Sequence, residues 1–282
     1  MDLFAHRVAV LATMHGKEAA IAPLLQAELN LKTIVPADFN TDAFGTFTRE
    51  IKRTGDQLTA ARFKAEAAMQ LVGETLGLAS EGSFGPHPAI PYLPCNRELV
   101  LLLDATHDLE IVGYDFSTDT NYRQQVVNSL EAALAFAQQI GFPSHGLVAM
   151  PTADSPEPAA IVKGIVTESE LREAVTPWLQ RQGSVYLETD MRAMLNPTRM
   201  QAIARATQDL IRKLRSHCPQ CDAPGFDVSD RKPGLPCGLC YTPTDLTLAA
   251  VYRCQKCGFT QDRLYPDGIE LADPAQCAYC NP

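Results

Sequence analysis

The sequence predicts an α/β protein with a mixed sheet flanked by helices, followed by a small C-terminal module that is held together by metal ions. Strand-like and helix-like segments alternate from residue 7 to about residue 216, which is typical of an α/β domain. Four C-x-x-C units then follow, all after residue 217. Because 282 residues are enough for one large and one small domain, we expect domains at residues 1–216 and 217–282.

The strands are expected where short runs are apolar and β-branched, as in RVAVLAT at the N-terminus. In chain order they span residues 7–13, 33–35, 76–79, 98–104, 109–114, 146–150, 160–166 and 185–188. The segment SEGS at residues 80–83 is rich in small residues, so we expect a flexible loop there. Residues 152–159 resemble a linker, and we interpret them as a surface loop.

The helices are expected where apolar residues recur three and four positions apart. In chain order they span residues 17–29, 54–72, 124–140, 168–181 and 196–214. Thr54 and Gln57 form a capping-box pattern, and Asn196-Pro197 is a typical helix start.

The composition limits the function classes. The formal net charge is −9, so the sequence argues against nucleic-acid binding. Apolar runs reach neither the length of a membrane span nor that of a signal peptide, which favours a cytoplasmic protein without membrane contact.

The eight cysteines of the C-x-x-C units predict two closed tetrahedral metal sites, because each unit can direct two thiolates at one ion. The ligands are Cys218, Cys221, Cys237, Cys240, Cys254, Cys257, Cys277 and Cys280. Sequential pairing of the units gives spacers typical of zinc ribbons, while a crossed pairing, first with third and second with fourth, is the alternative. Two structural zinc ions are expected in preference to iron or to disulfides.

The charge of this double zinc ribbon favours protein contact over nucleic acid. From Cys218 onward, eight acidic residues stand against five basic ones, and four thiolates around a divalent ion add about two negative charges per site. Phosphate backbones would be repelled by such a surface.

Polar side chains also follow the predicted strands of the larger domain, where open α/β sheets usually bind ligands. Thr13, His15 and Lys17 lie between the first strand and the first helix, a favourable place for a phosphate. A second group contains Arg62, Lys64, Glu81, Ser83 and His87, and Glu81 could hold Mg²⁺ or orient water.

A third polar cluster, ETDMR followed by NPTR, contains Arg192 and Arg199. One interpretation is a helix cap with ion pairs among Asp190, Arg192 and Arg199. The other is that both arginines bind a substrate anion, for which the guanidinium is well suited. The ninth cysteine, Cys95, is interpreted as a semi-buried spectator.

The order of several short motifs in the first ninety residues resembles the inosine/xanthosine triphosphate pyrophosphatase superfamily. These motifs are LAT at residues 11–13 with Lys17, GTF at 45–47, ARFKA at 61–65 and LASEG at 78–82. The resemblance implies a fold like that of those enzymes and Mg²⁺-dependent cleavage of nucleoside triphosphates. Lys17 and Lys64 would then hold phosphates, and Glu81 would bind metal or activate water.

The sequence departs from that superfamily in three respects. His15 stands where Asn is common, Ser80 replaces one acid of a double-acid motif, and a zinc module follows. A second metal ligand would therefore come from elsewhere, such as Asp104 or Asp115. The whole chain is more similar to an uncharacterised bacterial family with the signatures SEGSFGPHP, ETDMRAM-x-NPTRM and a terminal CNP.

The leading hypothesis is a metal-dependent hydrolase of nucleotides or related phosphorylated small molecules. Its expected catalytic residues are Glu81, Lys64 and Lys17, and its expected substrate-binding residues are Thr13, His15, Arg62, Ser83, His87, Arg192 and Arg199. The alternatives are a non-catalytic anion-binding and protein-interaction module, and a nucleic-acid-associated protein.

Overall fold

The computed structural model describes residues 3–41, 55–153 and 158–282, which form two compact units. Unit 1 is Met1–Ile211 and unit 2 is Arg212–Pro282. Within the described ranges, no helix has both the length and the apolar character that crossing a membrane requires. The expected GTF motif, Thr54 and half of the expected loop at 152–159 lie outside the described residues.

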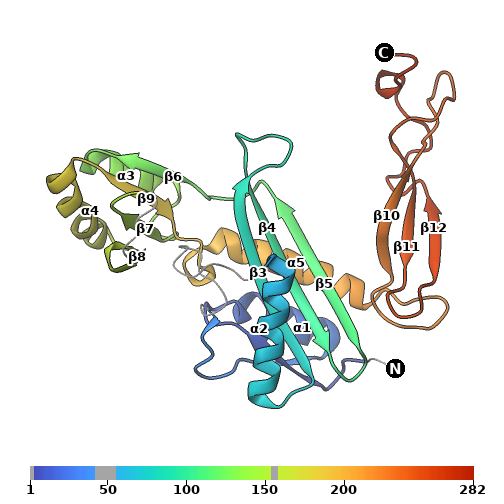
Figure 1. Ribbon diagram of the computed structural model, residues 1–282, viewed down its shortest axis with the longest axis horizontal. Coiled ribbons are helices and arrows are strands. Elements are labelled where there is room, and N and C mark those ends of the chain that lie inside the picture. The colour runs from blue at the N-terminus through green and yellow to red at the C-terminus, as the bar shows by residue number, and fades with distance from the viewer. Residues whose placement is uncertain (1–2, 42–54, 154–157) are drawn as a thin grey trace. The chain divides into compact units, whose positions relative to one another are not determined.

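Unit 1 contains a five-stranded mixed sheet, which confirms the predicted fold class at the level of a mixed α/β architecture (Figure 1). Its strands, in spatial order, are β2 (Lys32–Ile34), β1 (Val8–Ala12), β3 (Leu76–Pro86), β4 (Pro94–Asp104) and β5 (Leu109–Ser117). Strand β1 is parallel to β2 and β3, whereas β3, β4 and β5 are mutually antiparallel neighbours. The prediction of a loop at residues 80–83 is wrong. These residues continue β3, which pairs with β4 over its whole length.

Helices α2 (Gln57–Val72) and α5 (Pro197–Leu214) pack on opposite faces of this sheet. Helix α2 begins behind Asp56, whose side chain accepts a hydrogen bond from the Thr59 amide, and its buried alanines lie against β1, β3 and β4. On the other face, a Cβ at Gly113 would lie 2.1 Å from the Ala206 backbone oxygen. Gly113 is therefore required for the close approach of α5 to β5. Helix α1 (Glu18–Leu29) connects β1 to β2.

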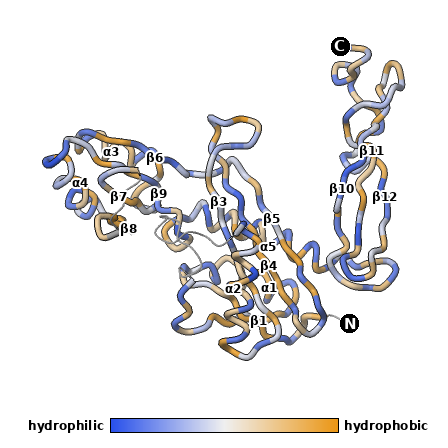
Figure 2. The backbone as a smooth tube through the Cα atoms, in the orientation of Figure 1, coloured by the Kyte–Doolittle hydropathy of each residue, from blue (hydrophilic) through white to orange (hydrophobic). Residues whose placement is uncertain are grey.

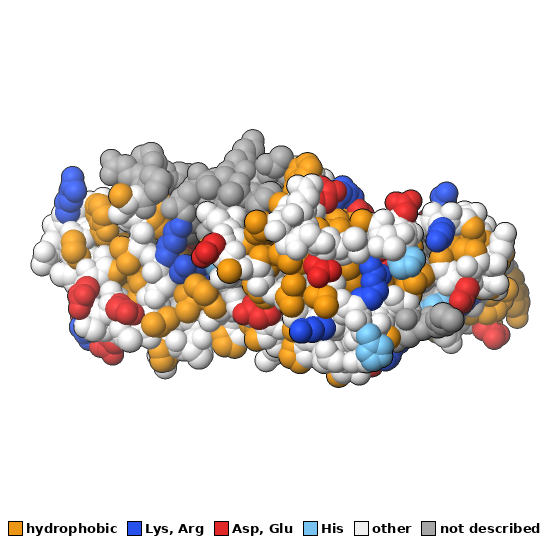
Figure 3. All heavy atoms as spheres, turned by 90° about the horizontal axis from the view of Figure 1, so that it is seen from below, with side chains coloured by type: hydrophobic (Ala, Val, Ile, Leu, Met, Phe, Trp, Pro, Cys, Tyr) orange, Lys and Arg blue, Asp and Glu red, His pale blue; other side chains and the backbone are white. Residues whose placement is uncertain are grey.

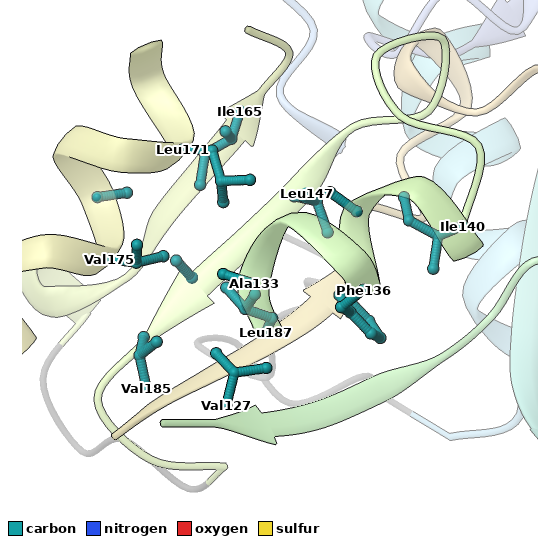
Figure 4. Packing of buried hydrophobic residues seen from close by; sticks show 13 residues of the cluster. Val127, Ala133, Phe136, Ile140, Leu147, Ile165, Leu171, Val175, Val185 and Leu187 are labelled. Carbon is teal, nitrogen blue, oxygen red and sulfur yellow. The ribbon is translucent and has the colours of Figure 1, made fainter. Parts of the chain in front are cut away.

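A second, four-stranded antiparallel sheet completes unit 1. Its spatial order is β6 (Gln124–Val127), β9 (Val185–Thr189), β7 (Leu147–Met150) and β8 (Val162–Ile165). Helices α3 (Leu130–Gln139) and α4 (Glu168–Gln182) bury their apolar side chains against this sheet (Figure 4). The helix expected over residues 124–140 is therefore wrong in its first part. Ser129 caps α3 by accepting from the Ala132 amide, and the residues before it pair with β9.

Unit 2 contains a three-stranded antiparallel sheet of β10 (Asp227–Pro233), β11 (Thr247–Arg253) and β12 (Thr260–Leu264). Nearly every side chain of β10 and β12 is exposed, and both strands are largely hydrophilic (Figure 2). A small apolar cluster surrounds Phe226, whose ring contacts Tyr252 and Phe259. Outside that cluster, Leu235, Ala249, Ala250 and Ala272 are also buried. So little buried apolar surface does not stabilise a small module unaided.

Candidate functional site

The structure gathers the eight cysteines of unit 2 into two groups of four. The first cysteine site consists of Cys218, Cys221, Cys254 and Cys257, and the second cysteine site consists of Cys237, Cys240, Cys277 and Cys280. The crossed pairing is therefore present, and the preferred sequential pairing is wrong.

The register of the sheet explains this pairing. Asp227 at the start of β10 lies opposite Arg253 at the end of β11, which brings the first C-x-x-C unit beside the third. Pro233 and Thr247 lie opposite each other at the other end, next to the second unit. Residue spacing does not reveal this register, because it depends on strand pairing.

The sulfur positions fit tetrahedral metal coordination. Four ligands at about 2.3 Å from one ion lie about 3.8 Å from one another. The Cys218–Cys257 and Cys221–Cys254 sulfur distances are 3.7 Å. In the second site, the Cys237–Cys280 distance is 3.9 Å and the Cys240–Cys277 distance is 3.7 Å. Both groups are thus compatible with structural zinc, and all cysteines of the chain are free of disulfides.

The four C-x-x-C units share one backbone turn. In each unit, the amide of the residue after the second cysteine donates to the carbonyl oxygen of the first. These donors are Asp222, Tyr241, Gly258 and Asn281, at 2.8–3.0 Å. In the first two units, the amides of Gln220 and Leu239 also donate to a cysteine sulfur at 3.4 Å. Amides directed at sulfur stabilise the thiolate form that a metal ion needs.

Hydrogen bonds lower the proton affinity of one thiol in the second site. Hydrogen bonds from the Thr242 side chain and backbone lower the pKa of Cys240 to about 6. These hydrogen bonds favour the thiolate, which is the form of cysteine that binds metal.

In unit 1, Lys17 lies at the edge of β3 just beyond the end of β1. Strand β1 stops at Ala12, opposite Ala79, and the next residue of β3 is Ser80. The Lys17 ammonium group donates to the Ser80 backbone oxygen at 2.6 Å. It thus takes the place of the backbone amide that β1 would supply if this strand continued. Lys17 is buried, and this burial is the main reason why its pKa falls to about 7.

Two buried ion pairs flank Lys17. The Lys64 ammonium on α2 contacts the Glu81 carboxylate on β3. Arg199 at the start of α5 donates to Glu98 on β4 at 2.8 Å. We call these five residues the cation cluster, and it contains three basic side chains and two carboxylates.

The two ion pairs of the cation cluster lie on opposite sheet faces. Glu98 is directly opposite Gly82 in the ladder, and side chains alternate between faces along a strand, so Glu81 points to the other face. A Cβ at Gly82 would lie 2.5 Å from the Arg199 guanidinium and from the Glu98 carboxylate. The glycine of the SEGS motif therefore makes room for the Arg199–Glu98 pair.

Lys17 is influenced by both pairs. Arg199 and Lys64 lower its pKa further, whereas Glu81 and Glu98 raise it. Among the described residues, the hydrogen-bond acceptors of Lys17 are the Ser80 backbone and hydroxyl oxygens rather than a carboxylate. The ammonium is therefore incompletely compensated.

A hollow of about 440 Å³ adjoins the loop that carries Lys17. Its lining includes Thr13 and Gly16 of that loop, the apolar Val35 and Phe39, and the acidic Glu18 and Asp38. This volume lies in the range of small-molecule sites. Thr13 is buried and accepts a hydrogen bond from the His15 amide through its hydroxyl oxygen.

Two other expected binding residues pair with carboxylates that are not part of the cation cluster. Arg62 forms a bidentate pair with Glu110 at 2.7 Å, and Arg192 pairs with Asp190. Arg199 pairs with Glu98 instead, so the two arginines do not form a joint anion site. Asn196 caps α5 by accepting from the Arg199 amide, as its Asn-Pro pattern indicates.

Ser83 and His87 lie further along or beyond β3 and are half-buried. The His87 ring contacts Phe116 at 5.3 Å. Cys95 is buried and donates weakly to the Pro86 carbonyl oxygen.

The carboxylates suggested as second Mg²⁺ ligands form ion pairs with other residues. Asp104 pairs with Arg7 and His107, and Asp115 pairs with Arg205 at 2.8 Å. Glu98 is the nearest candidate along the ladder, yet it faces the opposite side of the sheet from Glu81. None of these three carboxylates therefore fits as the second ligand of a Mg²⁺ ion at Glu81.

Glu98 is the functional candidate that the sequence interpretation did not select. Its signal was a charged residue at the head of the apolar strand ELVLLLD. A carboxylate in such a strand is rarely buried unless it is paired, and its partner Arg199 follows 101 residues later.

On the face shown in Figure 3, acidic and basic side chains are interspersed, without an extended basic patch. This distribution does not favour nucleic-acid binding on that face.

Comparison with known proteins gives one family. The family described as "Domain of unknown function (DUF6671)" matches residues 64–282. The matched segment includes four members of the cation cluster and all eight cysteines of the two cysteine sites. Neither the curated proteins nor the solved structures gave a match.

Proposed function

The chain belongs to the DUF6671 family, a domain of unknown function, and from that premise we propose that unit 1 binds a phosphorylated small molecule at the cation cluster. Unit 2 would hold two structural zinc ions, because each site offers four sulfur ligands and leaves no position open for a substrate.

The buried, incompletely compensated ammonium of Lys17 carries the proposal. Removing a cation from water costs free energy unless an opposite charge compensates it. Lys64 and Arg199 each contact a carboxylate, while Lys17 donates to uncharged oxygens of Ser80. A phosphate group would supply the missing negative charge and raise the Lys17 pKa toward its ordinary value.

The surroundings of Lys17 favour an anion that is attached to a larger molecule. Lys17 immediately precedes α1, and the amides at a helix N-terminus favour negative charge. The adjoining hollow combines apolar side chains with the acidic residues Glu18 and Asp38. An organic group such as a nucleoside would occupy that hollow, while its phosphates contact Lys17.

The pyrophosphatase reaction implied by the resemblance is a second candidate, and the buried Lys64–Glu81 pair favours it. A polyphosphate that attracts Lys64 would release the Glu81 carboxylate. Glu81 could then accept a proton from water as the water oxygen attacks phosphorus and a P–O bond breaks, with pyrophosphate as the leaving group. The described carboxylates give no basis for a step through Mg²⁺.

Calorimetric titration of the zinc-loaded full chain with ATP, ITP, pyrophosphate and phosphate tests the binding proposal. We expect Lys17→Met to weaken binding at least tenfold, because it removes the charge and keeps a similar length. Lys32→Met is the matched control, since Lys32 is exposed on β2. Wild-type chain that binds no member of this panel, or Lys17→Met that binds equally well, would refute the proposal.

Chromatography of the same nucleotide samples, with and without added Mg²⁺, tests hydrolysis. Glu81→Gln should abolish release of nucleoside monophosphate and leave nucleotide binding intact. Binding without turnover in the wild-type chain would identify unit 1 as a binding module and exclude the hydrolase for these substrates.

A further inference from the structure

The second cysteine site displays large apolar side chains to solvent. Leu239 lies between Cys237 and Cys240 and is 67% exposed, and Tyr279 lies between Cys277 and Cys280 and is 77% exposed. Tyr241, which directly follows Cys240, is 68% exposed.

The first cysteine site has the same backbone turns without these side chains. Gln220 and Lys256 occupy the turn positions that correspond to Leu239 and Tyr279. Asp222 corresponds to Tyr241, and both have a φ of 59°. The metal-binding turn therefore does not require apolar residues at these positions. Exposed apolar groups that the fold does not need mark an interaction surface when they gather in one place.

The backbone brings further apolar residues to this end of unit 2. The Gly238 amide donates to the Ala272 carbonyl oxygen, and a Cβ at Gly238 would lie 3.7 Å from the Leu271 side chain. Leu271 is half-exposed. The C-terminal segment therefore lies beside the turn that carries Leu239.

The charged residues of the two segments that carry the second site are all acidic. Residues 234–250 and 266–282 contain four acidic residues and no Lys, Arg or His. Asp267 pairs with Arg231, which leaves Asp245, Glu270 and Asp273 as exposed acids. A bound zinc tetrathiolate would add about two further negative charges. Nucleic acids and anionic membranes are repelled by such a surface.

A hollow of about 340 Å³ lies next to Tyr279. Residues Thr242–Asp245 form one part of its lining and Gln276–Tyr279 the other. It thus combines a carboxylate and an aromatic ring, the two groups that together bind a Lys or Arg side chain, by an ion pair and a cation–π contact.

We propose that the second cysteine site is a docking surface for a basic, apolar polypeptide segment of another protein. One Lys or Arg of that segment enters the hollow between Asp245 and Tyr279. Its neighbouring Leu, Ile or Phe side chains cover Leu239 and Tyr241. This proposal does not depend on ligand binding by unit 1.

Selection of a random twelve-residue peptide library on the zinc-loaded full chain tests the proposal. Tyr279→Lys serves as the counter-selection target, because Lys256 already occupies the equivalent turn position in the first site. The enriched peptides should carry Lys or Arg beside Leu, Ile or Phe. A selected peptide should lose at least tenfold in affinity for Tyr279→Lys and for Asp245→Asn, measured by fluorescence anisotropy.

The matched control is Lys256→Ala in the first cysteine site, which should leave the affinity unchanged. Metal content, measured on each variant, shows that both sites still bind zinc. Failure to enrich peptides over the Tyr279→Lys target, or enrichment of acidic peptides, would overturn the proposal. Tight binding of duplex DNA that Tyr279→Lys abolishes would also overturn it, in favour of a nucleic-acid surface.

Discussion

Raising the pH from 7 to 9 should stabilise unit 1 through Lys17. The pKa of Lys17 is about 7 in the folded chain, first because of burial and then because of Arg199, and about 10.5 in the unfolded chain. Between these values the unfolded chain binds a proton that the folded chain has released, so the free energy of unfolding rises with pH. One pKa unit corresponds to about 1.4 kcal/mol, and the Lys17 contribution between pH 7 and 9 is about 2 kcal/mol.

Urea denaturation at pH 7, 8 and 9, followed by fluorescence, measures this increment. The single tryptophan, Trp178, lies in α4 of unit 1, so its emission reports on that unit. Lys17→Met should lack the increment, whereas Lys32→Met should retain it, because its side chain is already exposed. An equal rise in Lys17→Met and wild type would refute the assignment to Lys17.

Three further predictions concern the metal sites and the core. Cys218→Ala combined with Cys257→Ala should leave one zinc ion by native mass spectrometry, whereas Cys218→Ala combined with Cys240→Ala should leave none; the sequential pairing requires the opposite. Arg199→Met leaves its carboxylate partner buried without a cation and should lower the free energy of unfolding by about 3–5 kcal/mol, as measured by urea titration; an effect below 1 kcal/mol would contradict this account. Gly113→Ala places a Cβ 2.1 Å from backbone on α5 and should lower the thermal midpoint, with a cost of about 3 kcal/mol or more, and an unchanged midpoint would show that α5 can shift freely.

Local sequence patterns predicted the elements whose character is set by their own residues. The apolar core of β1 and the Asn196 cap of α5 are examples, since each follows from neighbouring side chains. The start of α3 was misplaced because the apolar spacing of residues 124–140 continues through Val126 and Val127. Pairing of those two valines with β9, almost sixty residues away, decides their conformation.

The candidate sites show the same limit. The eight metal ligands could be selected from spacing, but their pairing depends on the β10–β11 register. Lys17, Lys64 and Glu81 could be selected as polar residues near strand ends. Glu98 could not be connected to Arg199 without the fold, because helices α3 and α4 and strands β5 to β9 separate them along the chain.

The crossed pairing couples the two metal sites of unit 2 through one sheet. Each cysteine site joins a segment before or after β10 to one that follows β11, so the two sites hold opposite ends of the same sheet. A sheet with almost fully exposed outer strands is marginally stable in water. Binding of the first ion fixes the β10–β11 register. Less conformational entropy is then lost when the second ion binds. The two ions should therefore bind with positive cooperativity, whereas sequential pairing would have produced two halves that bind independently.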